Sequence, residues 1–318
     1  MLISGTDCVG GLVGSSWGPG EISSSYSSGS VSATGNDVGG LVGDGSAEFA
    51  THSVWDVETS GQTRSDGGAG LTTAEMMDPE MLGLNGFAND PNWVLDPGQD
   101  YPHLAWEGTP GNMIPEPEID WLEGEGTPDN PYRIDTTDQL ILLGKASILW
   151  NRHFVMGADI ELDPALPGRR IFGQAVIRVF TGVFDGDGHT ISNLTIAGNR
   201  ELGLFGRLAA EAEVRSVGVV DVYIVGSGSC LGGLAGLNVK GSIDNCHSSG
   251  SVSGTGNLVG GIVGSNWGSI VSSYSIVSVI HIGFLSTIKI LSPDRNIRAS
   301  QNPAAFRFSS AAAVCFAA

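Results

Sequence analysis

The chain has 318 residues, of which 48 are glycine, 15% are charged and 7% are aromatic. Its apolar share of 41% excludes a disordered chain, and glycine without a three-residue period excludes collagen. Lys and Arg number 15 against 34 Asp and Glu, so a net charge of -19 disfavours nucleic acid and anionic membranes as partners.

A glycine-rich hexapeptide recurs through the chain. It occurs at 9–14, 38–43, 231–236 and 259–264, and a fainter copy lies at 202–206. Within each half of the chain, neighbouring copies are separated by 28 to 30 residues. A period this regular predicts stacked structural units, each of which buries apolar surface only against its neighbours.

Each unit also has a serine-rich second half, at 22–32 and again at 243–253. Ile22 and Val31 are nine positions apart, and an odd separation places two residues on opposite faces of one straight strand. We therefore expect a bend at Gly29, and at Gly250 in the later copy, where glycine accepts a positive φ. The pattern predicts that each unit is one coil of a β-solenoid, with coils ~4.8 Å apart.

Residues 1–50 are interpreted as the end of a first array, and residues 51–107 as its C-terminal cap. The cap leaves the repeat rhythm and carries the aromatic residues Trp55, Phe87, Trp93, Tyr101 and Trp106. The segment 72–75 has the form of a capping box and predicts a short helix from about Thr73 to Leu82 over the open end of the array. Tyr101 and Trp106 are alternatively sugar-binding platforms, although aromatic residues in a cap usually belong to a core.

Residues 108–125 are rich in proline and acidic side chains, which predicts a stiff, charged linker. Beyond the linker, the segment 136–139 forms another capping box ahead of four apolar residues, so we expect a helix that opens a second array at 126–275. Strand-like runs then follow at 154–156, 158–162, 176–180 and 191–196.

The pattern fails after Tyr274, and no glycine occurs from Phe284 to Ala318. We expect residues 276–318 to be a poorly ordered tail outside the fold, either a reading-frame artefact or an authentic sorting tail. The apolar run 276–288 is too short to span a bilayer comfortably. No signal peptide is visible at the other end, so an export signal lies upstream or does not exist. Because an array that begins inside a coil would have an uncapped end, we expect a fragment of a longer protein.

The segment 185–189, Asp-Gly-Asp-Gly-His, is the most reactive-looking cluster. Two carboxylates and an imidazole suit calcium or acid–base chemistry, but an EF-hand loop requires an acidic residue where Ile196 stands. We predict a turn there, with calcium binding by Asp185 and Asp187 as the alternative. No His-Glu-x-x-His or phosphate-binding loop occurs, so we predict no catalytic, cofactor-binding or metal-ligating residue.

The four cysteines, Cys8, Cys230, Cys246 and Cys315, form no metal-type pair. Cys230 and Cys246 are expected on adjacent strands of one unit, so a disulfide between them is conceivable. Two small buried thiols are the favoured alternative.

The repeated Gly-Gly-Leu-Val-Gly with its Ser-Ser-Tyr-Ser-Ser-Gly-Ser-Val half resembles the GLUG repeat of large secreted or surface-attached bacterial proteins, including adhesins and some IgA-cleaving peptidases. Residues 53–63, 72–77 and 101–106 resemble the segment that closes such arrays, and 126–134 and 184–191 the segment that opens one. The resemblance implies an all-β fold, a right-handed parallel β-helix (solenoid) in two arrays with short capping helices.

We therefore expect a non-enzymatic, extracellular structural or adhesive module of a larger surface protein. Its expected partner is carbohydrate or a host or cell-surface protein, with no nucleic acid and no membrane insertion by the repeat region. The rival function is that of a β-helix polysaccharide lyase or glycoside hydrolase, which requires acidic residues with Lys or Arg at matching positions on successive coils. The matched positions are Ser, Gly and Asn, with Asp244 alone and Glu21 offset, which disfavours the rival.

Overall fold

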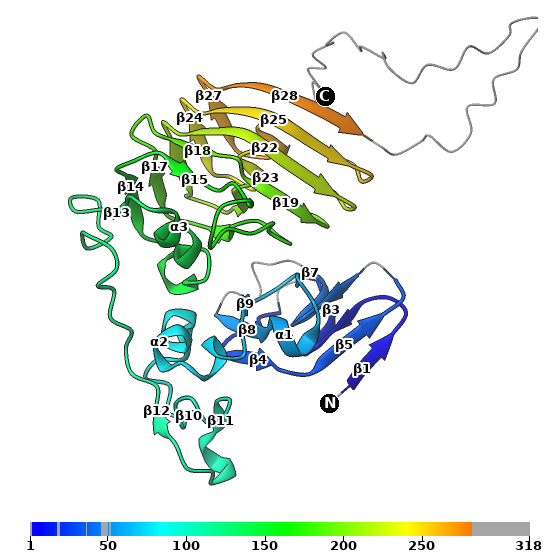
Figure 1. Cartoon of the computed structure of the whole chain (residues 1–318), viewed down its shortest axis with the longest axis vertical. Coiled ribbons are helices and arrows are strands. Elements are labelled where there is room, and N and C mark those ends of the chain that lie inside the picture. The colour runs from blue at the N-terminus through cyan, green and yellow to red at the C-terminus, as the bar shows by residue number, and fades with distance from the viewer. Residues whose placement is uncertain (1, 18–19, 36, 46–49, 51, 282–318) are drawn as a thin grey trace, which may run out of the picture. The chain divides into compact units, whose positions relative to one another are not determined.

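The computed structural model describes residues 2–17, 20–35, 37–45, 50 and 52–281 (Figure 1). These residues form mostly short strands with few helices, which confirms the all-β class. The predicted tail begins inside a described strand, since residues 276–281 continue β28 (Tyr274–His281). The expectation for residues 282–318 lies outside the described residues.

In the N-terminal repeats, each strand pairs in parallel with the strand about one period later. The first repeat contributes β1 (Leu2–Gly5), β2 (Val9–Gly10), β3 (Val13–Ser16) and β4 (Ser25–Ser27). Their partners are β5 (Ser30–Ala33), β6 (Val38–Gly39), β7 (Val42–Gly45) and β8 (Ser53–Asp56), and β8 also pairs with β9 (Ala69–Leu71). Matching residues of the motif stand side by side, such as Val9 and Val38.

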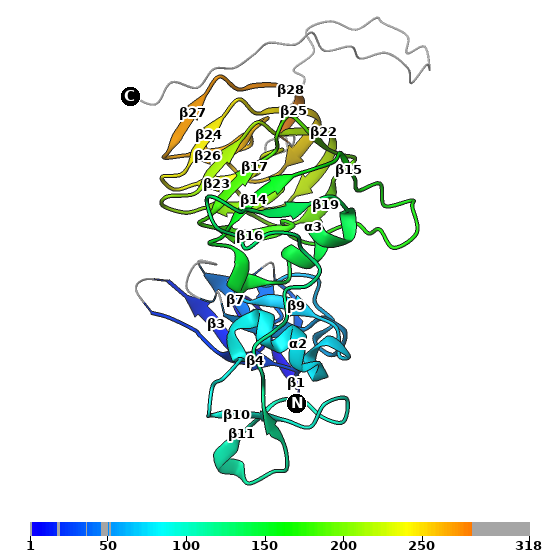
Figure 2. The ribbon, with the colours of Figure 1, turned by 90° about the vertical axis from the view of Figure 1, so that its left-hand side faces the viewer.

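The later repeats build three parallel sheets, to each of which successive repeats contribute successive strands (Figures 1 and 2). The first sheet contains β13 (Tyr132–Ile134), β14 (His153–Met156), β17 (Val183–Asp185), β21 (Glu213–Arg215), β24 (Ser242–Asp244) and β27 (Ser269–Val271). The second contains β15 (Ile160–Glu161), β18 (Thr190–Ser192), β19 (Thr195–Gly198), β22 (Gly218–Gly226), β25 (His247–Gly254) and β28. The third contains β16 (Ile177–Phe180), β20 (Phe205–Leu208), β23 (Ala235–Asn238) and β26 (Val263–Asn266). The runs predicted at 154–156, 158–162 and 176–180 each contain a strand, whereas the run at 191–196 is divided between β18 and β19 and β17 was not predicted.

Close backbone approach explains the paired glycines of the motif. A Cβ on Gly232 would lie 2.2 Å from the carbonyl oxygen of Ala235. A Cβ on Gly233 would lie 2.7 Å from the carbonyl oxygen of Gly261 and 3.1 Å from the Cβ of Ser248, a fully buried serine of the same repeat. Real Cβ atoms essentially never make contacts shorter than 3.0 Å, so both glycines of the pair are required sterically.

Polar residues in the left-handed region, rather than glycines, turn the chain between the first two sheets. Asp187, Ser216, Asn245 and Ser272 occupy this corner in successive repeats, with φ between 48° and 54°. The bend expected at Gly250 is present, with φ of 116°, but it lies inside β25, opposite an irregularity in β22. A short polar side chain tolerates the left-handed region better than a bulky one, which explains the residue types at the corner.

The cap of the first array is a set of short elements around buried aromatic residues. These are α1 (Val57–Ser60), η2 (Glu75–Met77), α2 (Pro79–Leu82), η3 (Gly83–Phe87), β10 (Trp93–Leu95), β11 (His103–Leu104) and η4 (Ala105–Glu107). The capping box forms, because Thr72 and Glu75 exchange side-chain to backbone hydrogen bonds of 2.9 and 3.3 Å. The helix predicted over Thr73–Leu82 is nevertheless split into η2 and α2, because Asp78 is extended and Pro79 begins the second piece.

The proline-rich segment after the cap is anchored to the fold. Its strand β12 (Asn112–Met113) pairs with β10, and Ile114 and Leu122 are buried. Apolar side chains placed among the charges thus hold parts of the segment 108–125 against the core.

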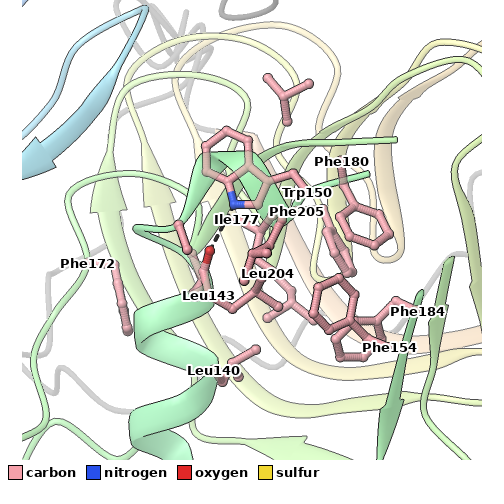
Figure 3. Packing of buried hydrophobic residues seen from close by; sticks show 14 of the residues in the cluster. Leu140, Leu143, Trp150, Phe154, Phe172, Ile177, Phe180, Phe184, Leu204 and Phe205 are labelled. Carbon is pink, nitrogen blue, oxygen red and sulfur yellow. Dashed lines mark hydrogen bonds between the residues drawn. The ribbon is translucent and has the colours of Figure 1, made fainter. Parts of the chain in front are cut away.

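The helix that opens the second array has the predicted cap. In α3 (Thr137–Leu143), the side chain of Thr136 accepts from the N–H of Gln139, whose own side chain accepts from the N–H of Thr136. After the turn η5 (Ser147–Leu149), the indole of Trp150 donates to the carbonyl of Leu143 at 2.8 Å (Figure 3). Beyond the helix lies a cluster of buried phenylalanines from two of the sheets, namely Phe154, Phe180, Phe184 and Phe205 (Figure 3).

Candidate functional site

Outward-facing side chains of the second array form two candidate surfaces, because the inward-facing ones are taken up by the core. The first, here called the acidic face, lies on the sheet of β17, β21 and β24. Asp185 pairs with Arg215, and Arg215 pairs with Asp244, so three matched positions carry charge. Glu213 lies two residues before Arg215 and faces the same way.

The guanidinium of Arg215 binds two carboxylates of the acidic face. Its Nε lies 2.8 Å from Oδ2 of Asp185, and its Nη1 lies 3.3 Å from Oε2 of Glu213. Asp244 stands on the other side of Arg215, two strand spacings or roughly 10 Å from Asp185 along the sheet. The arrangement places several carboxylates and one guanidinium on an accessible surface. Glycan-cleaving β-helices use the same combination of side chains.

Sequence reasoning missed this face, and the statement that Asp244 stands alone is corrected by the register. The repeats around Asp185 and Arg215 lack the serine-rich signature, so they were not aligned with the repeat that holds Asp244. The available signal was the dipeptide of a buried apolar residue and a charged one, which recurs as 184–185, 214–215 and 243–244.

The Asp-Gly-Asp-Gly-His segment forms the predicted turn. The N–H of Asp187 donates to Oδ1 of Asp185 at 2.9 Å, and Asp187 and Gly188 both have positive φ. Nδ1 of His189 lies 3.3 Å from Oδ1 of Asp159, and Asp185 uses its other oxygen for Arg215. Across the described residues, no three His, Cys, Asp or Glu side chains gather in a way that would hold a metal ion.

The second candidate surface, here called the serine–aromatic face, is the outer side of β22, β25 and β28. The rings of His247 and Tyr274 stack at 5.2 Å between centroids with 9° between planes, and Tyr274 is exposed. The His247 ring packs against Gly218 of the preceding strand, where a Cβ would lie only 2.4 Å from the ring. The absence of a side chain at position 218 therefore leaves space for the imidazole. The outward positions further along these strands are Tyr223, Ser249, Ser251, Ser253, Ile276, Ser278 and Ile280.

The two aromatic residues of the cap that were considered as sugar platforms differ in their surroundings. The hydroxyl of Tyr101 donates to Oδ2 of Asp56 at 2.6 Å, and its ring stacks on Tyr26 at 6.1 Å. Trp106, in contrast, is exposed. Tyr101 is therefore occupied by contacts inside the cap, and only the indole of Trp106 presents a free face.

The described cysteines are free thiols, including Cys230 and Cys246. Burial raises the pKa of each of these two thiols to about 11, so both are protonated at neutral pH. Cys246 occupies a position that is serine in other repeats, namely Ser25 and Ser273. Two free, protonated thiols, of which Cys246 is buried and Cys230 is partly buried, favour small packing residues over a redox pair.

Comparison with known proteins gives one family and two relatives. The GLUG motif matches residues 5–32 and 227–253. The chain is 34% identical over 152 residues to halomucin of Haloquadratum walsbyi. This alignment covers 44% of the present chain and 2% of halomucin. It is also 34% identical over 100 residues to a putative Gly-rich membrane protein of Evansella cellulosilytica, covering 30% of this chain and 11% of that protein.

No solved structure matches the chain significantly. None of the helices among the described residues is long and apolar enough to cross a membrane. The chain spans only a small fraction of the length of both relatives. The chain therefore carries the GLUG motif at two places, and both places fold into laterally paired strands.

Proposed function

We propose that the chain is a right-handed parallel β-helix that serves as a non-enzymatic, surface-associated module and binds carbohydrate on the serine–aromatic face. The register of the parallel strands and the standard hand of parallel crossovers support the fold. Two relatives whose names denote a mucin and a membrane protein support a surface location. Secretion and adhesion are parts of the same proposal.

The stacked pair of His247 and Tyr274 is the observation that carries the ligand class. An exposed aromatic ring offers an apolar face of the size of one pyranose ring, and hydroxyl groups can donate to and accept from sugar hydroxyls. Ser249, Ser251 and Ser278 supply such hydroxyls on the same face. The flat shape of a sheet suits an extended polysaccharide better than a globular partner.

A glycan array with the purified chain tests this function. We expect binding to polysaccharide, and Tyr274→Ala should weaken it roughly fivefold, because the substitution removes an aromatic stacking surface worth about 1 kcal/mol. Tyr274→Phe should retain binding. Trp106→Ala removes the exposed indole that is the alternative sugar platform, and it should leave binding unchanged if the serine–aromatic face is the site. Absence of glycan binding, or equal binding by Tyr274→Ala, would refute the proposal.

The acidic face favours one second candidate, cleavage of a polysaccharide. Inverting glycoside hydrolysis uses two carboxylates roughly 6.5–9.5 Å apart, and the acidic face groups the carboxylates of Asp185, Glu213 and Asp244 around Arg215. A reducing-end assay distinguishes the two functions. If the chain releases new reducing ends and Glu213→Gln does not, the chain is an enzyme and the non-enzymatic function is wrong. Binding of polysaccharide without turnover would support the non-enzymatic function.

A further inference from the structure

A cavity of about 260 Å³ lies next to β8 and is not part of either candidate surface. The described residues of both arrays belong to one compact unit, and both arrays line this cavity. Its lining includes Trp55 of β8, Ile141 of α3 and the segment 170–176 ahead of β16. Arg170 and Ile171 are exposed, so the cavity opens to solvent beside them. Its size suits a ligand on the order of ten non-hydrogen atoms.

The indole of Trp55 carries a buried hydrogen-bond donor next to this cavity. Trp55 is fully buried, and in the described part of the chain its Nε1 has no hydrogen-bond acceptor. A Cβ on Gly70 would lie 2.9 Å from Cζ2 and 3.2 Å from Cε2 of this ring, and Gly70 itself lines the cavity. The edge of the indole that bears Nε1 is therefore the edge beside the cavity. Buried donors in native proteins are almost always paired, so this one predicts an acceptor that the chain does not supply.

An unpaired acceptor and an unpaired cation lie on the segment 170–176. Oε1 of Gln174 is buried and has no donor among the described residues. The guanidinium of Arg170 lies 5.1 Å from the centre of the Phe172 ring, and it forms no ion pair with any carboxylate of the described chain. Lys145 also lines the cavity, but its ammonium already binds Glu75 at 2.5 Å. Arg170 is therefore the cation that can receive an anionic group.

We propose that this cavity binds a small hydroxylated aromatic carboxylic acid. The apolar lining, which includes Phe172, Ile141 and Val176, covers the ring of the ligand. The carboxylate pairs with the guanidinium of Arg170 in a charge-assisted hydrogen bond. A hydroxyl group both donates and accepts, so it supplies what Gln174 Oε1 and Trp55 Nε1 lack. Water would satisfy these polar atoms but would leave the apolar lining hydrated, which an aromatic ring avoids.

Calorimetric titration of the full chain with 4-hydroxybenzoate tests the proposal. We expect a Kd of about 1 mM or below, the affinity of a small ligand of this size in a cavity that fits it. Two related probes each remove one recognised group. Benzoate lacks the hydroxyl and 4-hydroxybenzamide lacks the charge, so each should bind about tenfold more weakly. A folded wild-type chain that does not bind 4-hydroxybenzoate would overturn the proposal.

A substitution of the exposed Arg170 locates the bound carboxylate. Arg170→Gln should weaken binding of 4-hydroxybenzoate about tenfold and leave binding of the uncharged 4-hydroxybenzamide unchanged. Arg169→Gln is the matched control, because the neighbouring guanidinium pairs with Asp138 at 3.0 Å and does not line the cavity. Equal binding of 4-hydroxybenzoate by Arg170→Gln and the wild type would contradict the proposed site.

A larger side chain in the cavity tests the location by a second route. Ile141→Phe fills part of the cavity and should abolish binding, while circular dichroism and the melting temperature confirm that the variant is folded. Unchanged binding by folded Ile141→Phe would place the ligand elsewhere and overturn the proposal. If Ile141→Phe does not fold, the exposed Arg170→Gln still decides. Tyr274→Ala should bind 4-hydroxybenzoate as the wild type does, because the cavity is separate from the serine–aromatic face.

Discussion

At the scale of single residues, the first glycine of each pair is fixed by the backbone around it. Gly232→Ala would bring a Cβ within 2.2 Å of a carbonyl oxygen, which cannot move without breaking the ladder. We expect the substitution to lower the free energy of unfolding by about 1–3 kcal/mol, as measured by chemical denaturation. A Cβ on Gly20 has no neighbour within 4 Å, so Gly20→Ala is the control. Equal stability of both variants would contradict the steric explanation.

A buried carboxylate in the cap links stability to pH. Burial by itself would raise the pKa of Asp56, but hydrogen bonds from the Tyr101 hydroxyl, the N–H groups of Thr59 and Glu58 and the Thr73 hydroxyl outweigh it and hold the pKa below its usual value. A lowered pKa in the folded state contributes stability above the unfolded pKa of about 3.9, and this contribution is lost as the pH falls through the folded pKa.

Asp56→Asn should therefore lower the free energy of unfolding by about 1–3 kcal/mol at pH 7, since it leaves buried donors unsatisfied. Denaturation curves of the variant and the wild type should converge as the pH drops below about 4. Asp129→Asn, at an exposed position, should leave stability within about 0.5 kcal/mol of the wild type. A difference between Asp56→Asn and the wild type that is independent of pH would show that the network is not electrostatic.

At the scale of elements, the capping box fixes where α3 begins. Thr136→Ala removes the acceptor for the N–H of Gln139 and should cost about 1 kcal/mol of stability. Thr136→Ser keeps the hydroxyl and should restore most of the loss. Thermal unfolding of the three proteins provides the comparison. If Thr136→Ala has the same melting temperature as the wild type, the packing of the buried face alone stabilises the helix.

Local sequence was sufficient for some elements and insufficient for others. Both capping boxes were predictable because they depend on residues three positions apart, and the strands β14, β15 and β16 were predictable from apolar runs. The short strand β17 was missed because it precedes the turn signal at 185–189. The break at Asp78 was not foreseen, although Pro79 stood in the sequence as its signal. The left-handed corners at Ser216 and Asn245 were missed because glycine was taken as the default residue there.

At the scale of the molecule, lateral pairing brings together residues that no local pattern connects. The acidic face exists only because Asp185, Arg215 and Asp244 are matched across three repeats. The serine–aromatic face depends in the same way on the register of Gly218, His247 and Tyr274. Where the motif is degenerate, the sequence alone does not show which residues of neighbouring repeats are aligned. The strand register shows this alignment directly.

Disulfide trapping measures that register most directly. In a background with the four natural cysteines replaced by serine, Tyr223→Cys with Ser251→Cys places two thiols on paired positions of adjacent strands, roughly 5 Å apart between Cα atoms and within disulfide reach. Tyr223→Cys with Ser253→Cys is out of register by two residues, with Cα atoms roughly 8 Å apart. We predict that mild oxidation cross-links the first pair nearly completely and the second pair poorly, as quantified by mass spectrometry of the linked peptides. Equal cross-linking of both pairs, or of neither, would contradict a parallel stack of repeats.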